Sequence, residues 1–198
     1  MINTLATLLV LLVTGDTPAA TSALSQVEAQ SMVAKLAVLE KRAKLAKPPR
    51  KTPMSVSQGE VNSYVNLTRG GEMPKGLSDV IVRFERDRLV ARGLLDLEQL
   101  RGRAALPEGL DGLLGFLSGK VPVEATGRLR MVEDGVGSFA IDDAHVATFP
   151  VSGTVIQQLA VWATKSAENP RGFDITSPFR LPYALKRVRL EPGRALLD

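Results

Sequence analysis

The residues of this chain that could do chemistry are few. Asp142, Asp143 and His145 place two carboxylates beside the single histidine, and such a set can hold a hard or borderline cation. Neighbouring side chains on a strand point to opposite faces, so Asp142 and Asp143 would not share an ion within an extended segment. We therefore interpret these residues as part of a solvated strand or bulge and predict no metal site.

Other catalytic patterns are weaker still. Glu85 and Asp87, and Glu133 and Asp134, fall at predicted hairpin turns, whereas acid–base carboxylates need a fixed separation within a cleft. No serine lies in a Gly-x-Ser-x-Gly sequence. The absence of cysteine excludes disulfides, thiol nucleophiles and cysteine-type zinc sites. The sequence thus predicts neither catalytic residues nor a cofactor, and we expect a binding protein rather than an enzyme.

Alternation is the strongest structural signal. Between Val121 and Met131 the apolar residues share one face and the polar residues the other, which is typical of a half-buried antiparallel strand. The same pattern predicts strands over 79–86, 88–97 and 136–149, and a final hairpin over 183–190 and 194–197. With amphipathic helices expected at 57–67 and 154–165, the sequence predicts an α+β fold. We expect a strongly curved antiparallel sheet wrapped around one or two helices, preceded by an extra N-terminal helix.

The domain organisation follows from the N-terminal third. Leu5 to Val13 is an apolar run that is too short to span a bilayer and is followed by small residues. We predict a signal peptide over 1–23, cleaved after Ala20 or Ala23. No Lys or Arg precedes Leu5, which leaves open an apolar N-terminus packed on the domain, or a start codon assigned too early.

The next segment, 24–53, is predicted to be a helix followed by a basic, proline-rich linker. Ser25 and Glu28 form a capping pattern, and Lys47 to Pro53 reads Lys-Pro-Pro-Arg-Lys-Thr-Pro. Residues 54–198 then form the α+β domain. The net charge of +4 and a pI near 9.6 favour contact between basic residues and an anionic membrane surface. The charges of 47–53 could equally serve linker solubility. No nucleic-acid-binding motif is present, so we expect no nucleic-acid partner.

Three segments carry a resemblance to a known family. They are Ser57–Tyr64, which opens a helix, Leu77–Phe84, and Leu181–Val188, which leads into Glu191–Ala195. Together they resemble small exported bacterial domains related to the tubular lipid-binding (TULIP-like) superfamily. The resemblance covers residues 54–198 and implies a curved sheet around a helix with a lipid held between them. Its motifs are apolar spacings and turns, so it transfers no individual functional residue.

We therefore predict an exported protein of the periplasm or cell envelope that binds, and could carry, a lipid or another apolar molecule. The ligand's apolar tail is expected to be lined by Val82, Phe84, Leu95, Val123, Ala125, Leu129, Phe139, Ile141, Leu159 and Trp162. A leucine- and glycine-rich segment is the expected gate, through Leu110, Leu113, Leu114, Phe116 and Leu117. The alternative is a ligand-free interaction module of an envelope complex, with a solid core and the helix at 25–46 as its docking element.

Overall fold

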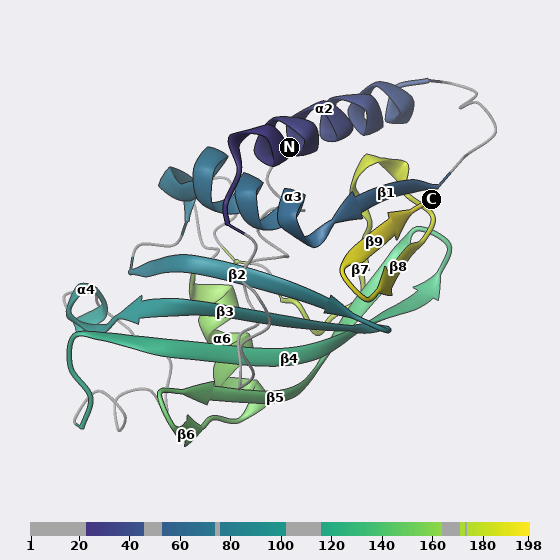
Figure 1. Ribbon diagram of the computed structural model, residues 1–198. Helices are drawn as coiled ribbons and strands as arrows, with labels where there is room; N and C mark the ends of the chain where they lie inside the picture. The colour runs from purple at the N-terminus through teal and green to yellow at the C-terminus, as the bar shows by residue number, and fades with distance from the viewer. Residues whose placement is uncertain (1–22, 46–52, 74–75, 102–115, 164–170, 173) are drawn as a thin grey trace.

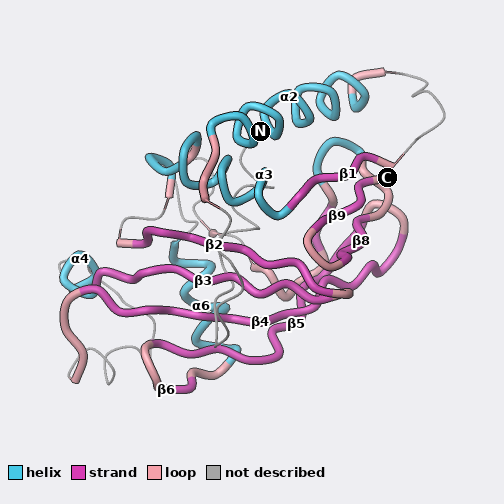
Figure 2. Tube along the Cα trace, viewed as in Figure 1, coloured by secondary structure: helices cyan, strands magenta, loops and turns pink. Residues whose placement is uncertain are grey.

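The computed structural model describes residues 23–45, 53–73, 76–101, 116–163, 171–172 and 174–198, which form an α+β fold as predicted (Figures 1 and 2). One antiparallel sheet has the order β2-β3-β4-β5-β6, with β7 paired to β5, and it does not close into a barrel. A second, three-stranded sheet has the order β1-β9-β8. The elements in chain order are α2 (Gln26–Ala43), β1 (Met54–Ser57), α3 (Gln58–Ser63), η1 (Tyr64–Thr68), η2 (Gly70–Glu72), β2 (Leu77–Glu85), β3 (Arg88–Asp96), α4 (Leu97–Arg101), β4 (Lys120–Glu133), β5 (Val136–Val146), β6 (Phe149–Pro150), α6 (Gly153–Ala163), β7 (Phe179–Arg180), η3 (Pro182–Ala184), β8 (Val188–Glu191) and β9 (Arg194–Leu197).

The larger sheet has one apolar face, which we call the apolar sheet face. The register aligns Val82, Ala91, Ala125 and Ala144 in a row across four strands, and none of these side chains is more than 1% exposed. Small side chains in this row let covering elements approach closely, which keeps the core tightly packed. The other members of this face are Val80, Phe84, Leu89, Leu95, Val121, Val123, Leu129, Met131, Phe139, Ile141 and Val146.

Strand β2 lies at one edge of this sheet. Side-chain amides from the helical segment before it form hydrogen bonds with the backbone groups of β2 that face away from β3. We call Gln58, Asn62 and Asn66 the amide ladder. Asn62 Nδ2 donates to the Val82 carbonyl at 3.0 Å, and Asn62 Oδ1 accepts from the Val82 N–H at 2.7 Å. Asn66 Nδ2 donates to the Val80 carbonyl at 2.6 Å, and Gln58 Oε1 accepts from the Phe84 N–H at 3.1 Å. Edge backbone groups that would otherwise be buried without partners are thereby satisfied.

The N-terminal helix α2 packs on α3 through a buried carboxylate. Its start is confirmed, because Ser25 Oγ accepts from the Glu28 N–H. The predicted capping box at Ser57 and Glu60 is also present, and Glu60 extends it by accepting hydrogen bonds from Ser31 and Lys35 of α2 at 2.5 and 2.7 Å. Burial raises the pKa of Glu60, but the hydrogen bonds of Lys35, Ser31 and the Ser57 N–H outweigh it, and the net pKa is lowered. An ionised Glu60 therefore joins the two helices.

The C-terminal region departs from the expected hairpin. A strand was predicted over 183–190, but the strand found is Val188–Glu191, and Pro182–Ala184 forms a 3-10 turn instead. Tyr183 and Ala184 have positive φ angles of 56° and 53°. Leu181 and Leu185, on either side of this turn, are both buried, and the turn brings both into the core. Strand β1 was not predicted as a strand. It pairs with β9, which joins residues 54–57 to residues 194–197.

Replacing the central rung of the amide ladder tests its structural role. Asn62→Ala is expected to lower the free energy of unfolding by about 2–4 kcal/mol, because it leaves both the N–H and the carbonyl of buried Val82 without partners. Urea titration followed by circular dichroism measures the change. Gln30→Ala, at an exposed position on α2, is the control and is expected to stay within about 0.5 kcal/mol of the unsubstituted protein. Equal stabilities for the two variants would contradict the role assigned to the ladder.

Candidate functional site

The predicted ligand-lining residues lie together. Val82, Phe84, Leu95, Ala125 and Phe139 are buried on the apolar sheet face. Val123, Leu129 and Ile141 belong to the same face and are half-buried. Leu159 of α6 is also half-buried and packs against the same core. The alternation that grouped these residues in the sequence is thus confirmed as one surface, while their role in binding stays a prediction.

The predicted gate is only partly within the described residues. Leu110, Leu113 and Leu114 lie outside them, as does the side chain of Trp162, which was predicted to line the ligand. Phe116 is 87% exposed. Leu117 is half-buried and packs against a small cluster at one end of the sheet, formed by Leu95, Leu97, Val121 and Val146. The two described gate residues therefore differ in environment, and only Leu117 contacts the core.

Helix α6 packs on β5 and lies behind the sheet in the view of Figure 1. Ile156 and Ala160 are buried on the helix. At the helix start, Gly153 lies near Ile141, and a Cβ placed on it would be in ordinary van der Waals contact with the Ile141 side chain at 3.7 Å. The N-terminal end of α6 therefore lies next to Ile141 of β5.

Helix α6 has fewer residues than strand β4 of the sheet on which it packs. Strand β4 has 14 residues and α6 has 11, which correspond to about 46 Å of strand and about 16 Å of helix. Some apolar side chains of β4, β5 and α6 stay only half-buried, and we call them the half-buried apolar group: Val123, Leu129, Met131, Ile141 and Leu159.

Part of the apolar sheet face is closed by its own side chains. A Cβ on Gly127 would lie 2.7 Å from the Phe139 ring and 2.8 Å from the Ala140 carbonyl. The ring therefore rests directly on the backbone of β4, and only glycine fits beneath it. An apolar ligand would have to lie beside Phe139, toward Leu129 and Ile141, rather than across Gly127.

A hydrogen-bonded loop ties α6 to β5. Asp174 Oδ1 accepts from Gln157 Nε2 of α6 at 3.0 Å and from the Thr176 N–H at 2.9 Å, and its Oδ2 accepts from Ser177 Oγ at 2.6 Å. The neighbouring Ile175 is 1% exposed, and its carbonyl accepts from the Phe139 N–H. The hydrogen bond from Ser177, with those from Thr176, lowers the pKa of Asp174 to about 2 despite partial burial.

The opposite face of the sheet is polar and carries the residues that most resemble an acid–base group. Arg92 Nε pairs with Glu124 Oε2 at 3.2 Å, and His145 stands opposite Glu124 in the strand register. Burial raises the pKa of Glu124, although the charges of Arg92, His145 and Arg83 act to lower it. The arrangement leaves Glu124 Oε1 buried without a hydrogen bond, so Arg92 and Glu124 form a partly desolvated ion pair on this sheet face.

The structure separates the residues first considered for metal binding. Strand β5 has a bulge at Asp142, whose two carboxylate oxygens share the hydrogen bond from Arg128 Nε, while Oδ1 also accepts from Arg128 Nη2 at 2.6 Å. The carboxylate oxygen Oδ2 of Asp143 lies instead 3.5 Å from His145 Nδ1. Within the described ranges, no three His, Asp or Glu side chains are grouped closely enough to hold a metal ion.

The chain matches no protein-family model, no curated protein and no solved structure. Its class is therefore defined by its own geometry: an open antiparallel sheet with one apolar face, a short covering helix and a helical layer along one edge. Among the helices described, none combines the length and the apolar character needed to cross a membrane.

Removing the Asp174 carboxylate tests whether this loop holds α6 in place. Asp174→Asn is expected to lower the free energy of unfolding near pH 7 by about 1–2 kcal/mol, because charge-assisted hydrogen bonds are lost. The folded-state pKa of about 2 lies below the ordinary value of 3.8. The ionised group therefore stabilises the fold above about pH 4, and this contribution disappears as the pH falls toward 2.

Thermal unfolding between pH 2 and 7 checks both statements. The difference between Asp174→Asn and the unsubstituted protein should shrink as the pH falls through this range. Asp143→Asn, which removes an exposed carboxylate, is the control and should change stability little at any pH. A constant difference across the range would contradict the assignment.

Proposed function

We propose that the protein is an exported lipid-binding protein of the bacterial cell envelope, which holds an apolar ligand between α6 and the apolar sheet face. The half-buried apolar group is the observation that carries this proposal. Five large apolar side chains from β4, β5 and α6 pack against the same core and remain partly accessible. A ligand placed there would complete their burial without breaking a strand or a helix.

Burial of an acyl chain at this site would provide enough free energy for binding. Burying apolar surface contributes about 25 cal/mol per Å², or about 0.8 kcal/mol for each buried methylene. About ten methylenes of an acyl chain would contribute roughly 8 kcal/mol before the cost of association. This is enough for a carrier that must also release its ligand. Specificity would come from chain length and shape, because the residues that line the face are aliphatic.

Two features of the sequence support the same proposal. The apolar run from Leu5 to Val13 with small residues after it is typical of an export signal. The chain also resembles the TULIP-like superfamily over 54–198, and the α+β architecture with an antiparallel sheet agrees with the fold expected from that resemblance.

A second candidate function is favoured by a different observation. The row of Val82, Ala91, Ala125 and Ala144 is fully buried, and Phe139 rests on Gly127. The centre of the apolar sheet face is therefore solid. If the half-buried apolar group only completes this core, the protein is a ligand-free interaction module of an envelope complex.

Filling the half-buried region separates the two candidates. Ile141→Trp places a larger side chain within the half-buried apolar group and is expected to weaken binding of a fluorescent fatty acid at least tenfold, because it occupies the ligand's space. Ala140→Trp is the matched control, since Ala140 is the next residue along β5, is also half-buried and lies on the opposite face. It should bind like the unsubstituted protein. Fluorescence titration gives the affinities, and circular dichroism confirms that both variants fold.

Native mass spectrometry of the protein purified from its own host identifies the ligand. A stoichiometric adduct that dissociates on organic extraction, and that is missing from Ile141→Trp, would establish lipid binding and name the lipid class. A mass without adduct, unchanged after incubation with envelope lipids and combined with no fatty-acid binding, would overturn the proposal in favour of the ligand-free module.

A further inference from the structure

Helix α2 has a second apolar face that nothing described covers. Of the large apolar side chains that are exposed in the described part of the chain, a majority belong to this helix and its two ends: Leu24, Val27, Val33, Val38 and Leu45. Val27 is 76% exposed and Leu45 is 52% exposed. Single exposed apolar residues are ordinary, but a cluster on one element marks a contact surface.

Two of these valines share one side of the helix with Ala34. Val27, Ala34 and Val38 follow one another at spacings of seven and four residues, which place them along one side of α2, and Leu45 lies just beyond the helix end at Ala43. The inner side is formed by Ala29, Met32 and Leu39, each at most 3% exposed. Helix α2 is thus apolar on two sides, of which the inner side is buried in the core and the outer side is exposed.

The outer side cannot turn inward, because polar contacts fix the rotation of the helix. Lys35 Nζ donates to Glu60 Oε2 and to the Ser55 carbonyl, both at 2.7 Å. The Ser25 N–H, at the helix start, donates to Ser63 Oγ at 3.0 Å. Rotating α2 would break these bonds and leave Glu60, which is 7% exposed, as an unpaired buried charge. We call the outer residues Val27, Ala34 and Val38 the α2 outer stripe.

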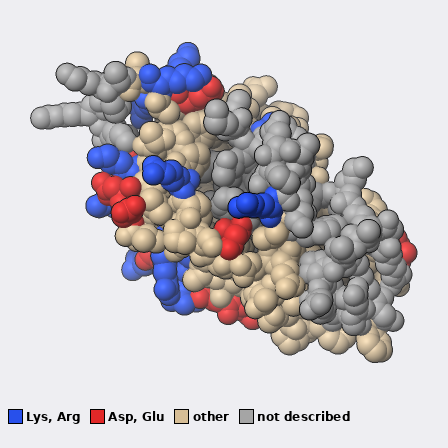
Figure 3. All heavy atoms as spheres, turned by 180° about the vertical axis from the view of Figure 1, so that it is seen from behind, with Lys and Arg blue, Asp and Glu red and all other residues tan. Residues whose placement is uncertain are grey.

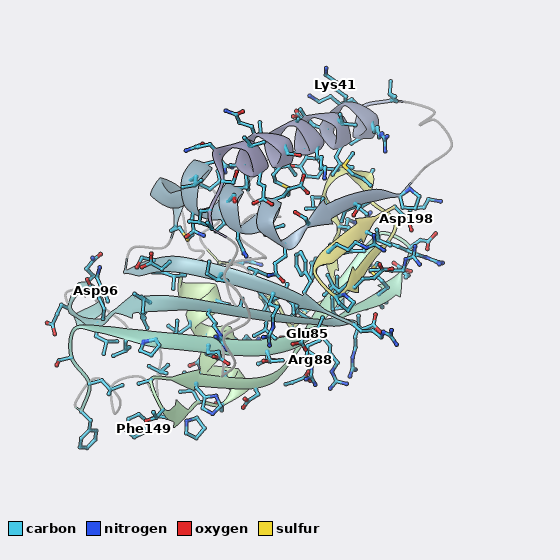
Figure 4. The ribbon with its side chains drawn as sticks, in the orientation of Figure 1. Lys41, Glu85, Arg88, Asp96, Phe149 and Asp198 are labelled. Carbon is cyan, nitrogen blue, oxygen red and sulfur yellow. The ribbon has the colours of Figure 1, made fainter. Side chains whose placement is uncertain are left out.

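Basic residues stand at the C-terminal end of the α2 outer stripe. Lys41 and Arg42 lie in the last turn of the helix, and Lys41 points away from the body of the protein (Figure 4). Of the two acidic residues of the helix, Glu28 accepts a hydrogen bond from Ser63, and Glu40 pairs with Lys44, so that these two charges offset each other. Seen from behind, Lys and Arg lie with Asp and Glu among them on the side that holds this end of α2 and the β8–β9 hairpin (Figure 3).

We propose that the α2 outer stripe docks the protein on an anionic lipid surface, with the valines entering the headgroup boundary and the basic residues contacting the headgroups. An amphipathic helix with basic residues beside its apolar side binds anionic membranes in this way. A second copy of the chain fits less well. One side of a helix of 18 residues has a contact area of about 27 by 10 Å, or roughly 270 Å². A stable interface buries about 800 Å² on each partner, so this side alone is too small for a dimer.

Vesicle binding of the full chain tests the proposal. Co-sedimentation with equal parts of phosphatidylglycerol and phosphatidylcholine is compared with phosphatidylcholine alone, at low and high salt. We expect binding to the anionic vesicles, weakened by salt. The double variant Val27→Asp and Val38→Asp is expected to bind at least tenfold more weakly. Asp at position 27 lies in the first turn, where a negative charge is compatible with the helix. Val132→Asp, at a 58% exposed position on β4, is the matched control and should bind like the unsubstituted protein.

A local probe shows which part of the chain meets the lipid. Because the chain has no cysteine, Val27→Cys and Val132→Cys each create a single site for an environment-sensitive dye. The dye at position 27 is expected to shift to the blue on anionic vesicles, and the dye at position 132 is not. This readout separates docking through α2 from insertion of the apolar run at Leu5–Val13, which all variants share.

Three results would overturn the proposal. The double aspartate variant could bind anionic vesicles like the unsubstituted protein, or the two dye positions could shift equally. Vesicle binding could also be absent, with a concentration-dependent dimer that the aspartates abolish, which would assign the stripe to self-association. Membrane docking through α2 does not depend on a bound lipid ligand. Ile141→Trp, which is designed to block the ligand site, should therefore still bind vesicles. This variant distinguishes a failure of the docking proposal from a failure of the ligand-binding proposal.

Discussion

The pairing of the amide ladder with the edge of β2 is the constraint on which the rest of the structure depends. Residues four apart on a helix advance about 6 Å along its axis, and residues two apart on a strand advance about 6.6 Å. This near match lets Gln58, Asn62 and Asn66 meet the backbone at Phe84, Val82 and Val80 in succession. The helix must therefore run alongside the strand and in the opposite direction, at a distance set by the length of an amide side chain.

Placing this helix along the edge also places the remaining layers. Once α3 is fixed, the Glu60 carboxylate on its other side receives Ser31 and Lys35 and so positions α2. Neither helix then covers the middle of the apolar sheet face. That task falls to α6, which packs on β5 and is tied to the loop before β7 by the hydrogen bond from Gln157 to Asp174. The short covering helix and the uncovered outer side of α2 are two results of one arrangement.

Local pattern was sufficient for much of this fold. The alternation from Val121 to Met131 identified the apolar sheet face, and Ser57 with Glu60 identified the start of α3, because burial on one face and capping are decided within a few residues. The amide ladder was not foreseen, since Asn62 and Asn66 look like solvent-facing residues until their partner strand is known. The sequence left open whether Asp142 lies in a regular strand or in a bulge, and it did not predict the turn at Tyr183, because both depend on which distant segments they must join.

The candidate site shows the same division. The sequence grouped Val123, Leu129 and Ile141 correctly on one face, since strand periodicity alone determines this. It did not indicate that Phe139 would rest on Gly127, because that contact needs the register between β4 and β5. Whether the apolar sheet face is filled by side chains or leaves space for a ligand depends on the combined volume of side chains from several elements. A pattern within one segment of the sequence does not determine this volume.

The pairing of β1 with β9 has a consequence for the order in which the protein can fold. Met54 and Leu197 are paired in the smaller sheet although they lie 143 positions apart in the sequence. The strand that leads into the amide ladder therefore has no partner until residues 194–197 are available, and closing so long a loop is entropically costly. Strands β2 to β5 pair with their neighbours in chain order and need no segment after residue 146, so the larger sheet can form before the smaller one is complete.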